Sequence, residues 1–278
     1  MLVRIFALVS PAAALALCWL SGDRGLSLVG HAALYGLALF LGLSLLFVLF
    51  AWICSLFVDQ SVPQTEIDPF YRWLTLEIAS LILFFSSVHI RASGLERIPA
   101  DRPFLLVSNH RSNYDPIVAI WVMRRFKLAF VSKPSNLRLP IVGNVVHKCC
   151  FLPIDREDDR KALTTILAAS DLIKNEACSV CIYPEGTRNK NGLGLLPFKA
   201  GAFKIAQRTF APVVVAATDG SERIHRHWPL PTTVHFTIAD VIAQSEGKRV
   251  STQVLSEKAQ EILCKTLHLP LPESNETP

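Results

Sequence analysis

The sequence predicts an α/β protein whose mostly parallel central sheet is flanked by helices and preceded by N-terminal membrane helices. Composition is the first reason, because 51% of the 278 residues are hydrophobic and only 18% are charged, which is more apolar than soluble domains usually are. The second is uneven charge: residues 1–90 hold three Lys or Arg against five Asp or Glu, and the other 188 residues carry +7. The third is that short apolar runs alternate with helical patterns in the basic part. We therefore expect a membrane anchor over residues 1–90 and a globular domain over residues 91–278.

Two long stretches without charged residues form the expected anchor. No Asp, Glu, Lys or Arg occurs between Ile5 and Gly22, nor in the 34 residues from Gly25 to Val58. A helix rises about 1.5 Å per residue and needs about 20 residues to cross a hydrocarbon core of about 30 Å. We expect a helical hairpin that turns at Ser21–Arg24. The first stretch also resembles a cleaved signal peptide, but no convincing small-x-small cleavage site precedes Gly22.

A third apolar stretch, Ile78–Ile90, spans 13 residues and suits an interfacial or third helix of the anchor. From Arg91 onward the chain is rich in Arg and Lys, so the positive-inside rule places the globular domain on the cytoplasmic face. Arg4 favours a cytoplasmic N-terminus, whereas the acidic link over residues 59–72 favours the opposite side. The sequence is consistent with an integral or a monotopic membrane protein.

Alternating β-like and helical patterns fill the globular domain. The expected strands are nearly continuous apolar runs, as in buried parallel sheets: residues 103–108, 128–132, 149–154, 178–183, 212–217 and 232–239. The expected helices cover residues 116–125, 158–175, 199–209 and 250–266. Strands and helices alternating in this way predict a sheet covered on both faces. The last ten residues, 269–278, are expected to form a disordered end.

Polar side chains follow four of these strands. Ligand sites of open parallel sheets lie beyond the carboxyl ends of the strands, so these side chains are the candidates for a functional site. The first strand is followed by a histidine and an aspartate, the second by a lysine, the third by an arginine, and the fourth by a glutamate and an arginine: His110, Asp115, Lys133, Arg156, Glu185 and Arg188. This set predicts a catalytic base beside an anion-binding cluster.

His110 and Asp115 are candidates for a base and the group that orients it. Five residues apart on a continuous helix they would stand about 140° apart, so contact requires a turn between them, and residues 111–113 include helix-capping types. A carboxylate on one imidazole nitrogen leaves the other free to take a proton. No G-x-S-x-G nucleophile motif occurs in the chain, so the hydroxyl would belong to the substrate. The alternative is a helix N-cap in which both side chains only satisfy backbone donors.

The turn after the fourth strand is the second candidate feature. Glu185-Gly186-Thr187-Arg188, followed by Asn191-Gly192, predicts a flexible turn whose exposed amides and guanidinium suit an oxyanion. No metal site is expected. Cys178 and Cys181 have C-x-x-C spacing, but they lie in an apolar run without a second pair, which favours packing. The histidines that include an H-x-H pair have no nearby carboxylate or cysteine set: His225, His227 and His235.

Four sequence blocks in order resemble the glycerolipid acyltransferases, the family that includes the PlsC-like 1-acyl-sn-glycerol-3-phosphate (lysophosphatidic acid) acyltransferases. The blocks are N-H-R-S-N-Y-D at 109–115, F-L-P-I-D-R at 151–156, Y-P-E-G-T-R at 183–188 with L-P-F-K-A-G at 196–201, and A-P-V-V-V at 211–215. The resemblance covers roughly residues 100–217, and the first 90 residues match only as an apolar anchor. Asn189 is a departure, since a serine often follows E-G-T-R.

The resemblance implies transfer of an acyl chain from acyl-CoA or acyl carrier protein to the sn-2 hydroxyl of 1-acyl-glycerol-3-phosphate, giving phosphatidic acid. His110 would be the general base and Asp115 its orienter. The positions it links to the substrate phosphate are Lys133, Arg156, Glu185, Gly186, Thr187 and Arg188, and Pro212 lies in a block linked to the acceptor or acyl site. No cofactor is implied beyond the acyl donor as co-substrate. The implied partners are membrane lipids, the lysophospholipid and the acyl carrier.

Two alternatives stay open at this point. The same chemistry could serve another lysolipid or glycerol 3-phosphate, because a phosphate site suits all phosphate-bearing acceptors. The chain could instead be a catalytically silent lipid-binding membrane protein, although such a protein has no need of a base and its orienter. Nucleic-acid binding is not expected, since +7 over 188 residues is modest and no nucleic-acid motif occurs.

Overall fold

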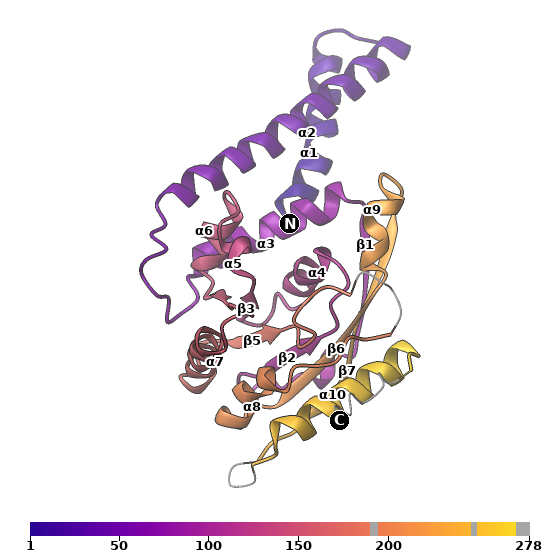
Figure 1. The fold of residues 1–278 in the computed structure, drawn as a ribbon. Coiled ribbons are helices and arrows are strands. Elements are labelled where there is room, and N and C mark those ends of the chain that lie inside the picture. The colour runs from indigo at the N-terminus through magenta and orange to yellow at the C-terminus, as the bar shows by residue number, and fades with distance from the viewer. Residues whose placement is uncertain (190–193, 246–248, 271–278) are drawn as a thin grey trace.

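The computed structural model describes residues 1–189, 194–245 and 249–270. Its centre is a seven-stranded sheet in the order β1-β7-β6-β2-β5-β3-β4 (Figure 1). All neighbouring strands are parallel except β6 and β7, so β7 and β1 run opposite to the other five. The strands are β1 Val88–Ser93, β2 Leu105–Ser108, β3 Leu128–Ser132, β4 Leu152–Pro153, β5 Ser179–Ile182, β6 Val213–Asp219 and β7 Thr232–Ile242. The predicted mostly parallel α/β sheet is confirmed.

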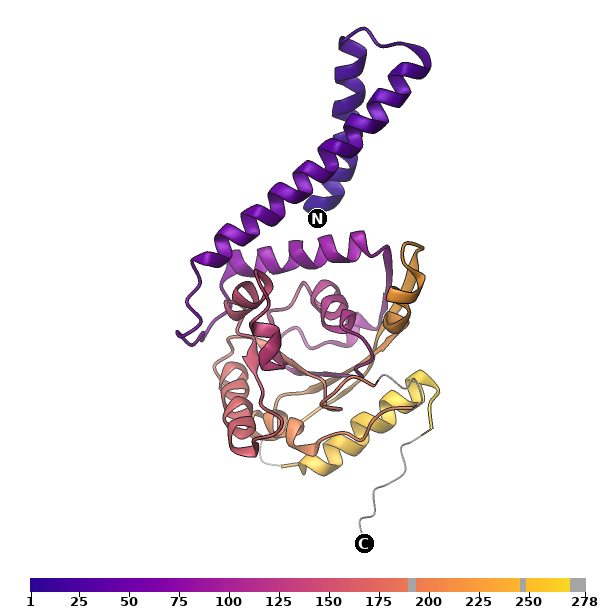
Figure 2. The same cartoon turned by 45° about the horizontal axis from the view of Figure 1, so that its top comes forward.

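Helices cover both faces of this sheet. They are α4 Tyr114–Val122, α5 Pro134–Leu137, α6 Val142–His147, α7 Asp159–Lys174, α8 Lys204–Thr209, α9 Ile224–His227 and α10 Thr252–Leu267. Helix α4 connects β2 to β3 and α7 connects β4 back to β5, in opposite directions across the sheet. Right-handed crossovers in opposite directions place their helices on opposite faces. Figure 2 shows α4 on the side of the N-terminal helices, and it shows the C-terminal helix α10 on the other side of the sheet.

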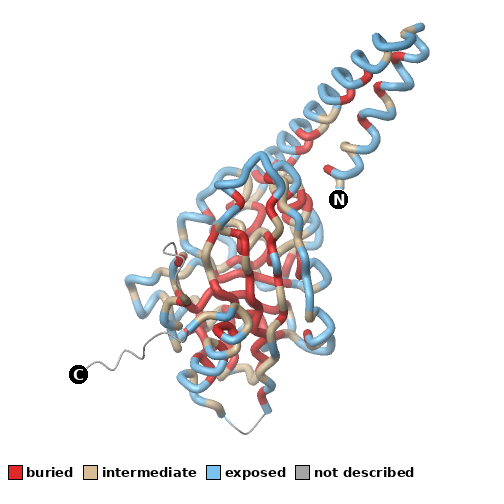
Figure 3. The backbone as a smooth tube through the Cα atoms, turned by 90° about the vertical axis from the view of Figure 1, so that its right-hand side faces the viewer, coloured by how far each residue is buried: buried red, intermediate tan, exposed pale blue. Residues whose placement is uncertain are grey.

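The N-terminal hairpin has the predicted form. Helices α1 Leu2–Leu20 and α2 Gly25–Leu56 flank the expected turn, and both are long and apolar enough to cross a membrane. Much of the hairpin projects away from the sheet domain, and its surface is mostly exposed (Figure 3). The two helices approach closely, because a Cβ built on Gly36 would lie 3.1 Å from the Cα of Pro11. The N-terminal segment is therefore stabilised by small residues inside and leaves its large apolar residues outside.

The helix expected over residues 78–90 is wrong at both ends. Helix α3 covers Pro69–Phe85 and begins inside the polar link, because the Asp68 carboxylate accepts hydrogen bonds from the backbone N–H groups of Phe70 and Tyr71. It ends before β1, which starts at Val88 and pairs with β7. The β-branched Val88 and Ile90 therefore extend the sheet instead of the helix.

Two further corrections concern the sheet domain. The strand expected over residues 149–154 is only two residues long, because the chain at Cys149 and Cys150 still turns back on α6: their N–H groups donate to the carbonyls of Val146 and His147. The helix expected over 199–209 is a 3-10 turn, Ala200–Phe203, followed by α8. The expected disordered end falls mainly in residues 271–278, outside the described residues. The core is formed by the central strands, and every residue of β2 and β5 is buried.

Candidate active site

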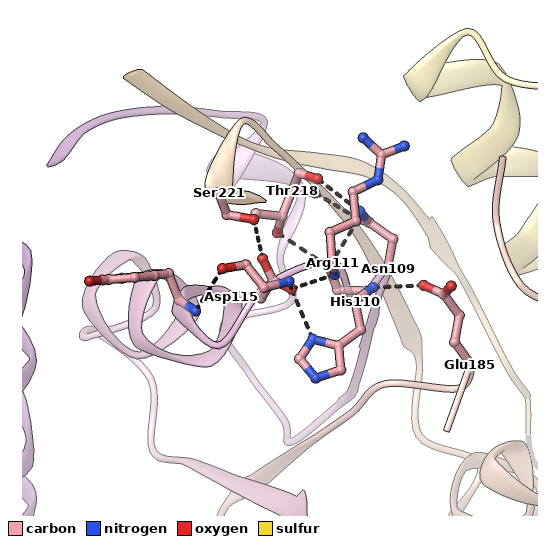
Figure 4. A network of polar contacts seen from close by, with 10 residues as sticks. Asn109, His110, Arg111, Asp115, Glu185, Thr218 and Ser221 are labelled. Carbon is pink, nitrogen blue, oxygen red and sulfur yellow. Dashed lines mark hydrogen bonds and ion pairs between the residues drawn. The ribbon is translucent and has the colours of Figure 1, made fainter. Parts of the chain in front are cut away.

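The predicted contact between His110 and Asp115 is confirmed. His110 lies in the loop after β2, and Asp115 lies in the first turn of α4. The chain turns between them, so that His110 Nδ1 is 2.8 Å from an Asp115 carboxylate oxygen. An ionised carboxylate only accepts hydrogen bonds, so Nδ1 is the donor, and in the neutral imidazole Nε2 then carries the lone pair. Nε2 lies on the side of the ring away from Asp115 (Figure 4), and 15% of the side chain is exposed.

Asp115 is fully buried and has four hydrogen-bond partners. The oxygen that contacts His110 also accepts from the backbone N–H groups of Arg111, at 2.7 Å, and Ser112, at 2.8 Å. The other oxygen accepts a hydrogen bond from the Ser221 hydroxyl. Asp115 therefore does satisfy backbone donors, as the N-cap alternative expects, and it holds the imidazole as well. Hydrogen bonds to a buried charged group are stronger than those between neutral groups. These four bonds therefore hold the carboxylate in one position.

The turn after β5 clamps the backbone of His110. One Glu185 oxygen accepts from the His110 N–H at 2.6 Å, and the other accepts from the Leu196 N–H at 3.0 Å. The Asn189 N–H donates to the His110 carbonyl at 2.7 Å. Burial raises the pKa of Glu185. The Glu185 carboxylate, placed with the phosphate-binding residues by the resemblance, is thus directed at backbone amides, where it positions His110.

Three further residues shape the site without having been assigned a role from the sequence. Asn109 exchanges two hydrogen bonds of 2.8 Å with the backbone of Thr218 and so ties the end of β2 to β6 (Figure 4). Ser221 holds Asp115, as described above. The Tyr183 ring stacks on the His110 imidazole with centroids 4.3 Å apart, and burial raises the pKa of Tyr183 well above its usual value. Asn109 and Tyr183 stood in the quoted blocks, whereas nothing in the local sequence singled out Ser221.

The predicted basic residues all follow strands that end at the same edge as His110. Arg188 follows β5, next to β2, while Lys133 follows β3 and Arg156 follows β4. Strands about 4.8 Å apart put the ends of β3 and β4 about 10 and 14 Å from the end of β2. Lys133 and Arg156 are exposed and Arg188 is half-buried, and no ion pair engages any of the three within the described residues. The three residues therefore follow three successive strands of the sheet rather than one, and we call them the row of cations.

Lys199 is a fourth cation in this region, and it lies beside Gly186. Gly186 has a positive φ of 70°, and a Cβ there would lie 3.0 Å from Lys199 Cε. The Lys199 stem therefore lies across the glycine, with its N–H donating to the Pro184 carbonyl at 2.9 Å. Thr187 is exposed on the same turn. The expected Asn191-Gly192 part of the turn lies outside the described residues.

Pro212 is not near this site. It precedes β6, and its carbonyl accepts a hydrogen bond from the N–H of Leu105, the first residue of β2. Because β2 and β6 are parallel, Pro212 lies at the opposite edge of the sheet from His110. Pro212 therefore cannot contact a substrate group that is bound at His110. Any role of this sequence block at the acceptor or acyl site must have another origin.

The cysteines and the H-x-H pair form no metal cluster among the described residues. Cys178 and Cys181 are both buried and free. The two cysteines are three residues apart along one extended segment, so their side chains point to opposite faces of the sheet. They therefore cannot bind the same metal ion. Cys178 instead neighbours Cys150, which is also free. Their burial agrees with the packing role.

The family model described as "Acyltransferase" matches residues 89–218, the segment that contains His110, Asp115, Glu185 and the basic residues of the site but not Ser221. Residues 89–218 belong to the acyltransferase family. A chloroplastic 1-acyl-sn-glycerol-3-phosphate acyltransferase of Arabidopsis thaliana is 32% identical over 200 residues, 66% of this chain and 55% of that protein. The 1-acyl-sn-glycerol-3-phosphate acyltransferase of Salmonella typhimurium is 34% identical over 122 residues, 44% of this chain and 49% of that protein. The chain spans about half the length of the curated relatives it matches.

A solved structure shows that the fold of this acyltransferase domain is shared. The 1-acyl-sn-glycerophosphate acyltransferase PlsC from Thermotoga maritima superposes with a TM-score of 0.60 at 21% identity, over 80% of this chain and 88% of that one. A human relative, 1-acyl-sn-glycerol-3-phosphate acyltransferase beta, is 33% identical over 131 residues, 47% of this chain and 46% of that protein. The acyltransferase domain and the apolar hairpin together fit a membrane-associated protein.

Proposed function

We propose that this protein transfers a fatty acyl chain from acyl-CoA or acyl carrier protein to the sn-2 hydroxyl of 1-acyl-glycerol-3-phosphate, giving phosphatidic acid. The observation that carries the proposal is the 2.8 Å contact between His110 Nδ1 and the buried Asp115 carboxylate. It leaves Nε2 directed away from Asp115, at the carboxyl ends of the strands, as the nitrogen that can take a proton. The relatives are 1-acyl-sn-glycerol-3-phosphate acyltransferases, which supports the choice of acceptor.

The proposed reaction needs one base and no covalent enzyme intermediate. His110 Nε2 takes the proton of the acceptor hydroxyl while its oxygen attacks the thioester carbonyl, and Asp115 stabilises the imidazolium that forms. The tetrahedral intermediate then breaks its C–S bond, and the imidazolium returns the proton to the leaving thiolate. Ser221 and Glu185 keep the Asp115 carboxylate and the His110 backbone in place during both proton transfers. A thioester is already activated, so alignment and base catalysis are sufficient.

The row of cations supplies the other half of the proposed site. A phosphate carries two or more acceptor oxygens, and a guanidinium matches two of them at once. Arg188 follows the strand next to β2, so it is the cation placed best for a phosphate whose glycerol hydroxyl reaches His110. Lys133 and Arg156 lie further along the same edge and extend the positive field to the rest of the headgroup or the acyl carrier.

The membrane anchor suits substrates that stay in the bilayer. Removing an acyl chain from lipid costs about 0.8 kcal/mol per CH₂, so an enzyme at the surface avoids extracting its acceptor. The proposal places the sheet domain on the cytoplasmic face, where its excess of Arg and Lys favours it.

The test of the base is acyl transfer by membranes that carry His110→Ala. We expect a loss of about 10² to 10⁴ in turnover with acyl-CoA and lysophosphatidic acid, read by mass spectrometry of phosphatidic acid. The matched control is His89→Ala, an exposed histidine on β1. Retention of more than about a tenth of the turnover in His110→Ala would remove the general-base role. Product from another lysolipid or glycerol 3-phosphate alone would change the acceptor, and no His110-dependent product with either carrier would favour a silent lipid-binding protein.

The phosphate site has its own test in Arg188→Ala. We expect KM for the lysolipid to rise by about tenfold or more, as for a lost hydrogen bond to a charged group, while KM for the acyl donor changes little. Steady-state kinetics with each substrate varied in turn provide the measurement. Equal rises for both substrates would move Arg188 out of the phosphate site.

A further inference from the structure

The segment between α9 and β7 exposes two large apolar side chains that the proposed reaction does not use. Trp228 is 61% exposed and Leu230 is 68% exposed. They alternate with two prolines, Pro229 and Pro231. We call residues 228–230 the apolar tip. A single exposed apolar side chain is ordinary, but a patch that joins other exposed apolar groups marks an interaction surface.

The apolar tip is continuous with the membrane hairpin. The Trp228 indole N–H donates a 2.9 Å hydrogen bond to the carbonyl of Phe85 at the end of α3. The Phe84 and Phe85 rings, 41% and 42% exposed, lie 5.6 and 5.7 Å from the ring of Phe40 on α2. Figures 1 and 2 show the loop after α9 beside this end of α3, on the side from which the hairpin projects. One apolar surface therefore runs from α2 over α3 to the tip.

We propose that the apolar tip is a second membrane contact, which inserts into the interface of the same bilayer that receives the hairpin. Tryptophan has an apolar ring with a polar N–H and is enriched at the depth of lipid headgroups. The residues before the tip are His225, Arg226 and His227, and basic side chains at this depth pair with anionic headgroups. Glu222 is the nearest acid along this segment, and it is engaged by Arg223 at 3.7 Å. Exposed apolar side chains next to basic residues are typical of segments that bind a membrane surface. The apolar groups enter the interface and the basic groups contact the headgroups.

The residues just before the apolar tip, 221–227, reach back to the site. Ser221, at its start, donates to Asp115, and the His225 ring packs against Tyr114 with centroids 5.1 Å apart. The Tyr114 hydroxyl is in turn 2.8 Å from the Ser86 hydroxyl at the end of α3. A tip held in the bilayer therefore sets the height and tilt of the sheet domain above the lipid. This contact stands on exposure and connectivity alone and does not depend on the proposed reaction.

Quenching of tryptophan emission by brominated lipid tests the contact in the full chain. The protein is reconstituted in vesicles of phosphatidylcholine and phosphatidylglycerol that carry bromine at the headgroup end of the acyl chains, and unbrominated vesicles serve as reference. The emission of Trp228 is the difference between wild type and Trp228→Phe. We expect this difference to be blue-shifted and to fall by about half or more in brominated vesicles, as for an indole at the interface. Bromine near the chain ends should quench it less.

Two further variants complete the experiment. Leu230→Trp in the Trp228→Phe background gives a second reporter on the tip, and it should be quenched in the same way. Val254→Trp in that background is the matched control, because Val254 is 40% exposed on α10, on the other side of the sheet, and it should stay unquenched. Tip emission that is unquenched and red-shifted like the control would place the tip in water and overturn the proposal. Emission that is blue-shifted but unquenched would place the tip against protein, and would also overturn it.

Discussion

The hairpin buries mainly small side chains where α1 faces α2, whereas large side chains predominate in the core of the sheet domain. In the hairpin the buried positions include Ser10, Ala14 and Gly36, while leucines such as Leu45, 69% exposed, cover the outside. In the sheet domain Leu106 is fully buried, and large aliphatic and aromatic side chains fill the interior. In lipid, small residues at the interface let two helices pack closely. In water, the hydrophobic effect favours burial of the large apolar side chains. The difference between the two regions therefore follows from their solvents, lipid for the hairpin and water for the sheet domain.

The largest effect that tests this contrast is a pair of leucine truncations. Leu106→Ala should lower the free energy of unfolding of the sheet domain by about 2–5 kcal/mol, because it leaves a cavity in a buried strand. Leu45→Ala should change it by less than about 0.5 kcal/mol in detergent, since this side chain packs on no protein core. Denaturant unfolding of both variants in the same micelle is the measurement. Similar losses for the two would mean that the outer face of the hairpin is covered by protein.

A pair of glycine substitutions on α2 sharpens the contrast from the other side. A Cβ at Gly36 would lie 3.1 Å from the Cα of Pro11, whereas a Cβ at Gly30 would meet nothing within 4 Å, and we compare leucine at the two positions. We expect Gly36→Leu to lower the local opening free energy of α1 by about 1–3 kcal/mol through overpacking, and Gly30→Leu to leave it unchanged. Hydrogen exchange of the α1 amides in micelles reads the difference. Equal exchange in both variants would show that close helix approach does not hold the hairpin together.

The smallest expected effect is a pH dependence of the sheet domain that comes from Glu185. Burial raises the pKa of Glu185 above its ordinary 4.5, so the folded state keeps this proton to higher pH than the unfolded chain. The free energy of unfolding therefore falls as pH rises from 4.5 through the raised value, and is level above it. Glu185→Gln cannot titrate, so the melting temperature of wild type minus that of the variant should fall across this window. A difference that rises with pH would show that the hydrogen bonds from His110 and Leu196 outweigh burial.

Much of the fold followed from local patterns, and the errors have one local and one long-range cause. Uncharged length predicted the hairpin and its turn, and apolar runs between helical patterns predicted the six strands after residue 100. The end of α3 was missed because the apolar run Ile78–Ile90 continues without interruption from a helix into a strand. Strand β1 exists only because β7 lies beside it, and no local pattern reports a distant partner.

The sequence by itself determined which groups are available: a histidine with an aspartate five residues on, cations after successive strands, and an anchor too apolar for water. Only the tertiary structure decided what they do. It brings Ser221 to Asp115 across 106 residues, and Glu185 to the backbone of His110 across 75. It also directs the Glu185 carboxylate at the backbone amides of His110 and Leu196, and it places Pro212 at the opposite ends of the strands from His110. Spacing along the chain determines only contacts between residues that are near in sequence. The contacts of Ser221 and Glu185 depend on the order of strands in the sheet, and long-range packing selects that order.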